Sequence, residues 1–265
     1  MNIRNLTIAA LLLGSTAVAA EQAGAPPRLP PGMVPGYLAL EAVPDSAALV
    51  PPAPAKKSGT EARDKAASRV ALAARSTPRW AFAASDADLF SPKATGALSC
   101  AAGFEISPQT TPKLDKLLRR TIIDFGFSTY RAKQKFNRDR PFETNKRPIC
   151  TPDQDAMLRK DGSYPSGHSA IGFGWGLMLA GLVPDRATQV VSRGRAFGES
   201  RRFCNVHWQS DVEEGRIVAA AVYARLQADA AYQADLAAVR EELASAPRQA
   251  PARDCAAEAS ALAGG

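Results

Sequence analysis

Histidine, cysteine and long apolar runs are scarce in this 265-residue chain, and each scarcity excludes a class of protein. The chain has two histidines, His168 and His207, and four cysteines. No Cys-x-x-Cys or His-x-x-x-His spacing occurs, which argues against a metal site. Beyond residues 1–20 there is no run of about 18 apolar residues, so we expect a soluble mature protein without membrane spans.

Residues 1–20 are predicted to be a secretory signal peptide and not part of the fold. Arg4 precedes an apolar run over residues 6–13, and small residues then offer cleavage after Ala19 or Ala20. The apolar run is too short to span a bilayer, which makes a membrane anchor the weaker interpretation. We therefore expect a periplasmic or secreted protein.

The four cysteines are Cys100, Cys150, Cys204 and Cys255. An even number of cysteines in an exported chain favours two disulfides. Four cysteines allow three connectivities, and sequence alone does not choose among them. Our working assignment pairs Cys100 with Cys150 and Cys204 with Cys255.

The remaining chain divides into a proline-rich extended segment over residues 21–58 and a single all-α domain over residues 59–265. In the first segment, four apolar residues are expected to dock onto the domain: Tyr37, Leu38, Leu40 and Leu49. No hairpin signal, alternating strand pattern or internal repeat is visible, so the predicted fold class is all-α, a compact helical bundle. Helices are expected over 61–75, from Thr111 toward Lys133, from Ser166 to Leu182, from Arg186 to Glu199, and from His207 or Gln209 to Leu226, continuing after a break to Leu243.

The formal net charge of +7 is spread through a chain in which basic and acidic residues are mixed. Such mixing is typical of an ordinary solvated surface, so we expect no nucleic-acid partner and, after signal cleavage, no membrane partner. We likewise expect seven basic residues to lie on the solvated surface: Lys135, Arg138, Lys146, Arg147, Arg193, Arg195 and Arg202.

Each histidine lies in a polar cluster. Ser166, Gly167 and His168 fall at a predicted helix start, where free backbone N–H groups and the helix dipole can bind an anion. By itself this pattern also fits a helix-capping serine beside a surface histidine. In the second cluster, His207 and Asp211 share one face if the segment is helical, so the carboxylate can orient the imidazole. The competing interpretation is a surface His–Asp pair.

Three cations accompany these clusters. Lys133 and Arg140 lie seven residues apart, and Arg201 precedes His207 by six. Arginine binds two oxygens of an oxyanion through its planar fork, and lysine acts as a point charge. Each cation alone would be assigned to the surface; together with the two histidine clusters they predict a site for a tetrahedral oxyanion.

The joint pattern resembles a known signature. Its parts are Lys133-x6-Arg140-Pro141, then Pro165-Ser166-Gly167-His168, then Ser200-Arg201-x5-His207-x3-Asp211. This pattern resembles the type 2 phosphatidic acid phosphatase superfamily, and within it the bacterial class A non-specific acid phosphatases. The resemblance covers roughly residues 37–226. Asn205 and Ser169 depart from it, where glycine and threonine are common, and we expect them to affect substrate preference at most.

The resemblance implies hydrolysis of small-molecule phosphate monoesters of broad specificity through a phosphohistidine, with no metal and no other cofactor. His207 would attack phosphorus, Asp211 would orient it, and His168 would act as general acid and then base. The implied phosphate-binding residues are Lys133, Arg140, Ser166, Gly167 and Arg201. A homo-oligomer is also implied, and transfer of the phosphoryl group to another alcohol is chemically open.

Two alternatives use the same residues. Vanadium-dependent haloperoxidases resemble the superfamily and hold vanadate where phosphate would lie. A non-catalytic periplasmic phosphate- or anion-binding protein would use the site without turnover. A lipid phosphatase is disfavoured, because those enzymes resemble proteins with several membrane spans and this chain has none.

Overall fold

The computed structural model describes residues 34–245 and 247–264, and the predicted signal peptide lies outside them. Within this range the chain forms helices and loops without a strand, which confirms the all-α fold class. No helix in the same range has the length and apolar character needed to cross a membrane. The α-helices are α1 (Ser46–Leu49), α2 (Gly59–Ala73), α3 (Pro78–Ser85), α4 (Ser99–Ala102), α5 (Pro112–Phe127), α6 (Tyr130–Phe136), α7 (Pro141–Asn145), α8 (Asp155–Leu158), α9 (Gly167–Leu182), α10 (Ala187–Phe203), α11 (Gln209–Leu226), α12 (Ala230–Ser245) and α13 (Cys255–Ala263). The 3-10 helices are η1 (Leu40–Ala42), η2 (Ala94–Leu98), η3 (Pro152–Gln154) and η4 (Pro184–Arg186).

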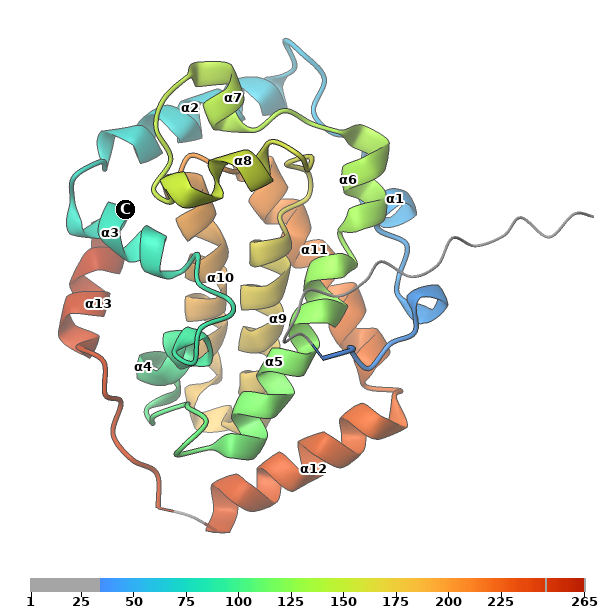
Figure 1. Cartoon of the computed structure of the whole chain (residues 1–265), viewed down its shortest axis with the longest axis vertical. Helices are drawn as coiled ribbons and strands as arrows, with labels where there is room; N and C mark the ends of the chain where they lie inside the picture. The colour runs from blue at the N-terminus through green and yellow to red at the C-terminus, as the bar shows by residue number, and fades with distance from the viewer. Residues whose placement is uncertain (1–33, 246, 265) are drawn as a thin grey trace, which may run out of the picture.

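Helix α9 is the centre of the bundle and packs against α5, α10 and α11 (Figure 1). Its Trp175 is fully buried and donates its indole N–H to the Leu118 carbonyl of α5 at 3.0 Å. Close packing against α10 requires small residues: a Cβ on Gly176 would lie 2.9 Å from the Val190 carbonyl oxygen. The glycine-rich composition of α9 therefore sets how closely the two helices approach.

The helix predicted to run from Thr111 toward Lys133 is interrupted. Helix α5 ends at Phe127, and Lys133 lies on the separate helix α6. At the junction, Ser128 Oγ donates to the Phe125 carbonyl at 2.6 Å and Thr129 Oγ1 donates to the Gly126 carbonyl at 2.7 Å. Hydroxyls that bond to nearby carbonyls compete with the helical backbone ladder, which explains the break.

The start of α5 is capped by a residue distant in sequence. Thr111 occupies the predicted N-cap position before Pro112, but its side chain makes no capping hydrogen bond. Instead, the Glu242 carboxylate of α12 accepts from the backbone N–H groups of Lys113 at 2.8 Å and Leu114 at 3.0 Å. A carboxylate also stabilises the positive end of the helix dipole, so this contact fixes α12 across the end of α5 (Figure 1).

Part of the proline-rich segment packs on the domain. Tyr37 is buried, its backbone N–H donates to the Asp124 carboxylate at 3.0 Å, and its hydroxyl donates to Asp235 at 2.6 Å. Leu38 packs against the core as well. The expected docking is therefore correct for these two residues and wrong for Leu40 and Leu49, which are 49% and 41% exposed.

The two disulfides differ from the working assignment. The bonds join Cys100 to Cys255 and Cys150 to Cys204, so both predicted pairs are wrong. Neighbours along the chain are not neighbours in space here: Cys255 begins α13, which the fold brings beside α4, where Cys100 lies. The Cys150 N–H donates to the Cys204 carbonyl at 3.3 Å, so a backbone contact already aligns the second pair.

Candidate active site

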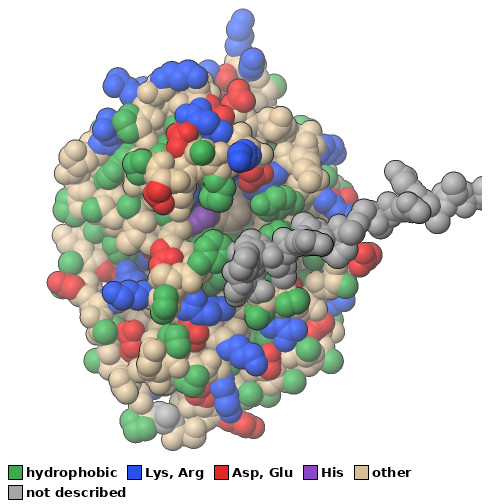
Figure 2. Space-filling model, viewed as in Figure 1, with side chains coloured by type: hydrophobic (Ala, Val, Ile, Leu, Met, Phe, Trp, Pro, Cys, Tyr) green, Lys and Arg blue, Asp and Glu red, His purple; other side chains and the backbone are tan. Residues whose placement is uncertain are grey.

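The predicted site residues converge at one end of the bundle. The start of α9, the end of α10 and the segment before α11 meet there, with α6, α7 and α8 around them (Figure 1). The backbone N–H of Ser166 donates to the Asp211 carbonyl at 2.9 Å and thereby joins two of these segments. Figure 2 shows a histidine side chain in a recess between the surface side chains of one face.

His207 and Asp211 contact each other, though not along one helix face. His207 lies outside α11, Trp208 is its N-cap residue, and Asp211 lies in its first turn. The Asp211 Oδ2 atom is 3.3 Å from His207 Nδ1 and accepts from the Trp208 N–H at 2.8 Å. Helix capping thus holds the carboxylate against the ring. Because a carboxylate only accepts, Nδ1 carries the proton of the neutral ring and Nε2 is the unprotonated nitrogen, with its lone pair available as an acceptor.

Asp211 is itself held by a buried ion-pair chain. Arg138 donates to Asp211 Oδ1 at 2.6 Å and to Asp64 Oδ2 at 2.7 Å. Asp64, on α2, also accepts from the Ser210 N–H at 2.8 Å and from the Ser210 hydroxyl at 2.6 Å. Both carboxylates are fully buried. This series of contacts therefore fixes the orientation of the His207 imidazole, because it connects Asp211 through Arg138 to Asp64 on α2.

Arg140 and Lys133 flank His207. The Arg140 NH1 atom lies 3.2 Å from His207 Nε2 and donates to the Val206 carbonyl at 3.0 Å. Lys133 Nζ donates to the Gly162 carbonyl and lies 3.2 Å from Asp161 Oδ2. Asp161 is also 3.5 Å from Arg140 NH2. Two buried cations thus share one partly exposed carboxylate, which leaves excess positive charge beside the imidazole.

Arg201 is the least satisfied group in the described part of the chain. It is fully buried, and neither its Nε nor its NH1 has a hydrogen-bond partner among these residues. Its one contact of this kind is from NH2 to Gln154 Oε1, at 3.4 Å. Burying a guanidinium whose N–H groups lack acceptors costs free energy, unless a bound anion supplies the missing acceptors. Arg201 is therefore suited to bind an oxyanion.

Ser166, Gly167 and His168 lie at the start of α9, as predicted. Ser166 Oγ accepts from the Ser169 N–H at 3.2 Å, so the serine caps the helix while its own O–H can still donate. His168 Nε2 lies 3.1 Å from the Ala87 carbonyl oxygen. Since a carbonyl only accepts, Nε2 carries the proton of the neutral ring, and Nδ1 is the nitrogen left to exchange a proton with a ligand.

Burial and neighbouring cations shift the pKa values at the site in one consistent direction. Burial lowers the pKa of His207 well below 6.5, and Arg140 lowers it further. Burial and Arg201 have the same effect on the pKa of His168. Burial, followed by the Arg140 charge, lowers the pKa of Lys133 to about 8 and that of Arg201 to about 9. All four shifts disfavour further positive charge, so an anion at this place would be stabilised.

The expectation of an ordinary solvated surface is wrong for three of the seven basic residues, Arg138, Arg193 and Arg202. Arg138 is largely buried in the chain described above, and Arg193 is buried between Asp86, at 3.2 Å from its NH1, and Glu258, at 2.9 Å from its Nε. Their partners are far away in sequence, so local charge mixing could not reveal them. Arg138 does lie inside the Lys133-x6-Arg140 motif, and that position was its only sequence signal. Lys135, Lys146, Arg147 and Arg195 are exposed as expected. The Arg202 side chain is only 13% exposed and pairs with Glu199 at 3.2 Å.

Asn205 has a local structural explanation. Its φ of 62° lies in the left-handed region, which glycine and asparagine tolerate best. Its side-chain amide exchanges hydrogen bonds with Asn145 at 2.8 and 3.1 Å. The backbone conformation thus accounts for asparagine at a position where glycine is common.

Among residues 34–245 and 247–264, no group of three or more His, Cys, Asp or Glu side chains is arranged to hold a metal ion. The expectation of metal-independent chemistry stays a prediction.

Comparison with known proteins identifies relatives whose sequences align with most of this chain. The model of the PAP2 superfamily matches residues 120–232, which include all of the predicted site residues. The non-specific acid phosphatase of Salmonella typhimurium is 40% identical over 195 residues, covering 73% of this chain and 78% of the relative. The acid phosphatase of Zymomonas mobilis is 39% identical over 198 residues, 75% of each chain. The non-specific acid phosphatase of Providencia stuartii is 40% identical over 210 residues, covering 78% of this chain and 84% of the relative.

Proposed function

Because the chain belongs to the PAP2 superfamily, we propose that it is an acid phosphatase that hydrolyses phosphate monoesters through a phosphohistidine. The observation that carries the proposal is the buried Arg201 guanidinium, two of whose nitrogens have no partner among the described residues, in a cluster with Arg140, Lys133 and two histidines. A phosphate dianion would supply the missing acceptors and neutralise the excess charge.

In the first step, His207 Nε2 attacks phosphorus and the bond from phosphorus to the alcohol oxygen breaks. Arg140, whose NH1 lies 3.2 Å from this nitrogen, would transfer its hydrogen bond to a phosphate oxygen. His168 Nδ1, protonated in the substrate complex, gives its proton to the leaving alcohol. Asp211 stabilises the positive charge that develops on His207.

In the second step, water attacks the phosphohistidine and the phosphorus–nitrogen bond breaks. His168 Nδ1 takes the proton from water and is ready for the next cycle. Lys133, Arg140, Arg201, the Ser166 hydroxyl and the Gly167 N–H bind the phosphoryl oxygens in both steps. An alcohol in place of water would give phosphotransfer.

Cellular location and assembly are also proposals. The signal-like residues 1–20 and the two disulfides support a periplasmic or secreted enzyme. The superfamily resemblance supports a homo-oligomer.

The test is hydrolysis of p-nitrophenyl phosphate at mildly acid pH in excess EDTA, by the wild type and by His207→Ala. We expect full wild-type activity and its loss in the variant. Activity lost to EDTA, or retained by His207→Ala, would overturn the mechanism. A folded wild type without activity would overturn the assignment as a phosphatase and favour the anion-binding alternative.

A further inference from the structure

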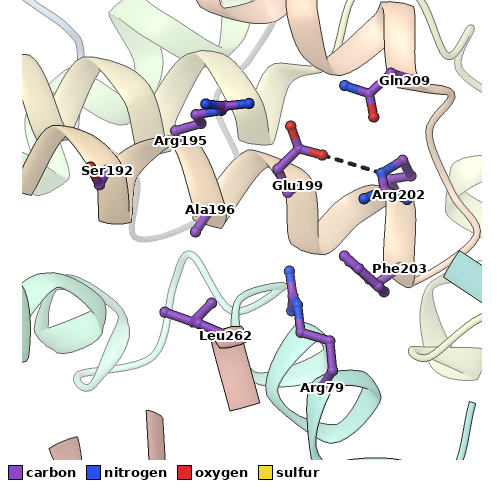
Figure 3. A pocket seen from close by; sticks show the side chains of 9 residues that line it. All are labelled: Arg79, Ser192, Arg195, Ala196, Glu199, Arg202, Phe203, Gln209 and Leu262. Carbon is purple, nitrogen blue, oxygen red and sulfur yellow. Dashed lines mark hydrogen bonds and ion pairs between the residues drawn. The ribbon is translucent and has the colours of Figure 1, made fainter. Parts of the chain in front are cut away.

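A second cationic pocket lies on the other side of α10. It has a volume of about 400 Å³ and is bounded by side chains of α3, α10 and α13 (Figure 3). Glu199 of α10 lines this pocket, whereas Arg201 belongs to the candidate active site. Two residues along an α-helix turn by about 200°, so these side chains face opposite sides. The pocket is therefore separate from the active site.

Arg79 is the central group of this pocket. Figure 3 shows its side chain reaching from α3 toward α10. It is 3% exposed, and its guanidinium lies over the Phe203 ring at 4.1 Å. Within the described range its one hydrogen bond runs from NH1 to Ser200 Oγ, at 3.1 Å. An arginine has five N–H donors, so most of those on Arg79 remain available to a ligand.

The carboxylates near Arg79 are already engaged. Glu199 pairs with Arg202 at 3.2 Å and also with Arg216. Asp86 accepts from Arg193 and, at 2.6 Å, from Ser200 Oγ.

Arg195, which also lines the pocket, is exposed. No ion pair with a carboxylate is formed by Arg79 or Arg195 in the described part of the chain. The pocket thus has two cations that form no ion pair among the described residues, one of them buried.

We propose that this pocket binds a tetrahedral oxyanion of the phosphate type, held by the buried Arg79 and by the exposed Arg195. A buried guanidinium favours such a ligand because its planar fork matches two oxyanion oxygens. The volume falls within the range of small-molecule sites. Burial lowers the pKa of Arg79 to about 10, which still leaves the side chain charged at neutral pH. The proposal does not depend on the phosphatase activity.

The test measures binding of inorganic phosphate by isothermal titration calorimetry in a buffer free of other oxyanions. All variants carry Arg201→Met, which weakens phosphate binding at the active site. We expect this background to retain one phosphate site. Adding Arg79→Met abolishes that site, and adding Arg195→Glu weakens it by roughly tenfold, because an attraction becomes a repulsion. Adding Arg240→Glu, at an exposed arginine on α12, leaves it unchanged.

Circular dichroism checks that each variant is folded. If Arg79→Met fails to fold, the phosphate affinities of Arg195→Glu and Arg240→Glu are compared instead, because both of these arginines are exposed. No phosphate binding in the Arg201→Met background would overturn the proposal. Binding that Arg195→Glu leaves unchanged would overturn it too.

Discussion

The Arg138 guanidinium donates at 2.6 Å to Asp211 Oδ1, the oxygen that Asp211 does not share with His207. The same guanidinium bonds to Asp64 at 2.7 Å, so one side chain neutralises two buried carboxylates. Burial raises the pKa of Asp211, and the Arg138 charge opposes that rise. Arg138 therefore helps to keep Asp211 ionised and oriented toward His207.

For Arg138→Lys we expect a fall in kcat on the order of tenfold, the scale seen when a residue that orients a reacting group is altered. Lysine keeps the charge but lacks the fork that spans Asp64 and Asp211. KM should change little, because Arg138 contacts Asp211 and is not one of the residues proposed to bind phosphate. Steady-state kinetics check this, with Arg131→Lys, an exposed ion-pair residue, as control. Wild-type kcat in Arg138→Lys would refute the positioning role.

The pH profile of kcat/KM should peak at acid to neutral pH. The lowered pKa of His207 keeps its Nε2 unprotonated and nucleophilic in mild acid. As pH rises through about 8, Lys133 loses its proton, and the site loses one of the charges proposed to bind phosphate. His168 must also be protonated in the substrate complex, which favours the acid side. A profile that peaks above about pH 8 would contradict this account. Lys135→Met, at an exposed lysine on the same helix, should leave the profile unchanged.

Replacing Arg201 should stabilise the fold while abolishing activity. In phosphate-free buffer, Arg201→Met removes a buried guanidinium with unpaired nitrogens, and the free energy of unfolding should rise by about 1–3 kcal/mol. Denaturant unfolding measures this, with Arg195→Met, at an exposed position, as a control that changes by about 0.5 kcal/mol or less. Phosphate should stabilise the wild type more than Arg201→Met. Equal stabilisation of both proteins would count against phosphate binding by Arg201.

The disulfide connectivity can be tested directly. Peptide mapping without reduction should recover Cys100 joined to Cys255 and Cys150 joined to Cys204. Replacing both Cys100 and Cys255 by serine should lower the free energy of unfolding by about 2–5 kcal/mol, because the bond closes a loop with a sequence separation of 155 residues. Recovery of Cys100 joined to Cys150 would refute the arrangement of α4 and α13.

The sequence by itself determined the fold class, most of the long helices and the set of chemical groups at the site. Apolar periodicity predicts helices because it depends only on neighbours three or four residues away. The motif around Ser166 and Gly167 is local in the same sense, since a helix start creates its own anion-binding N–H groups. The pair His207 and Asp211 was found for the same reason, although helix capping, and not a shared helical face, brings them together.

Only the tertiary structure decided which charges are buried and what they contact. Arg138 and Asp64 are 74 residues apart, and Glu242 caps a helix start 129 residues before it. The disulfide between Cys100 and Cys255 spans 155 residues. Such contacts depend on how the helices pack around α9, and nothing in the neighbouring sequence records them. The same packing buries Arg201 and leaves its Nε and NH1 without acceptors among the described residues. The physical reason is that burial, unlike helix formation, is a property of the whole fold.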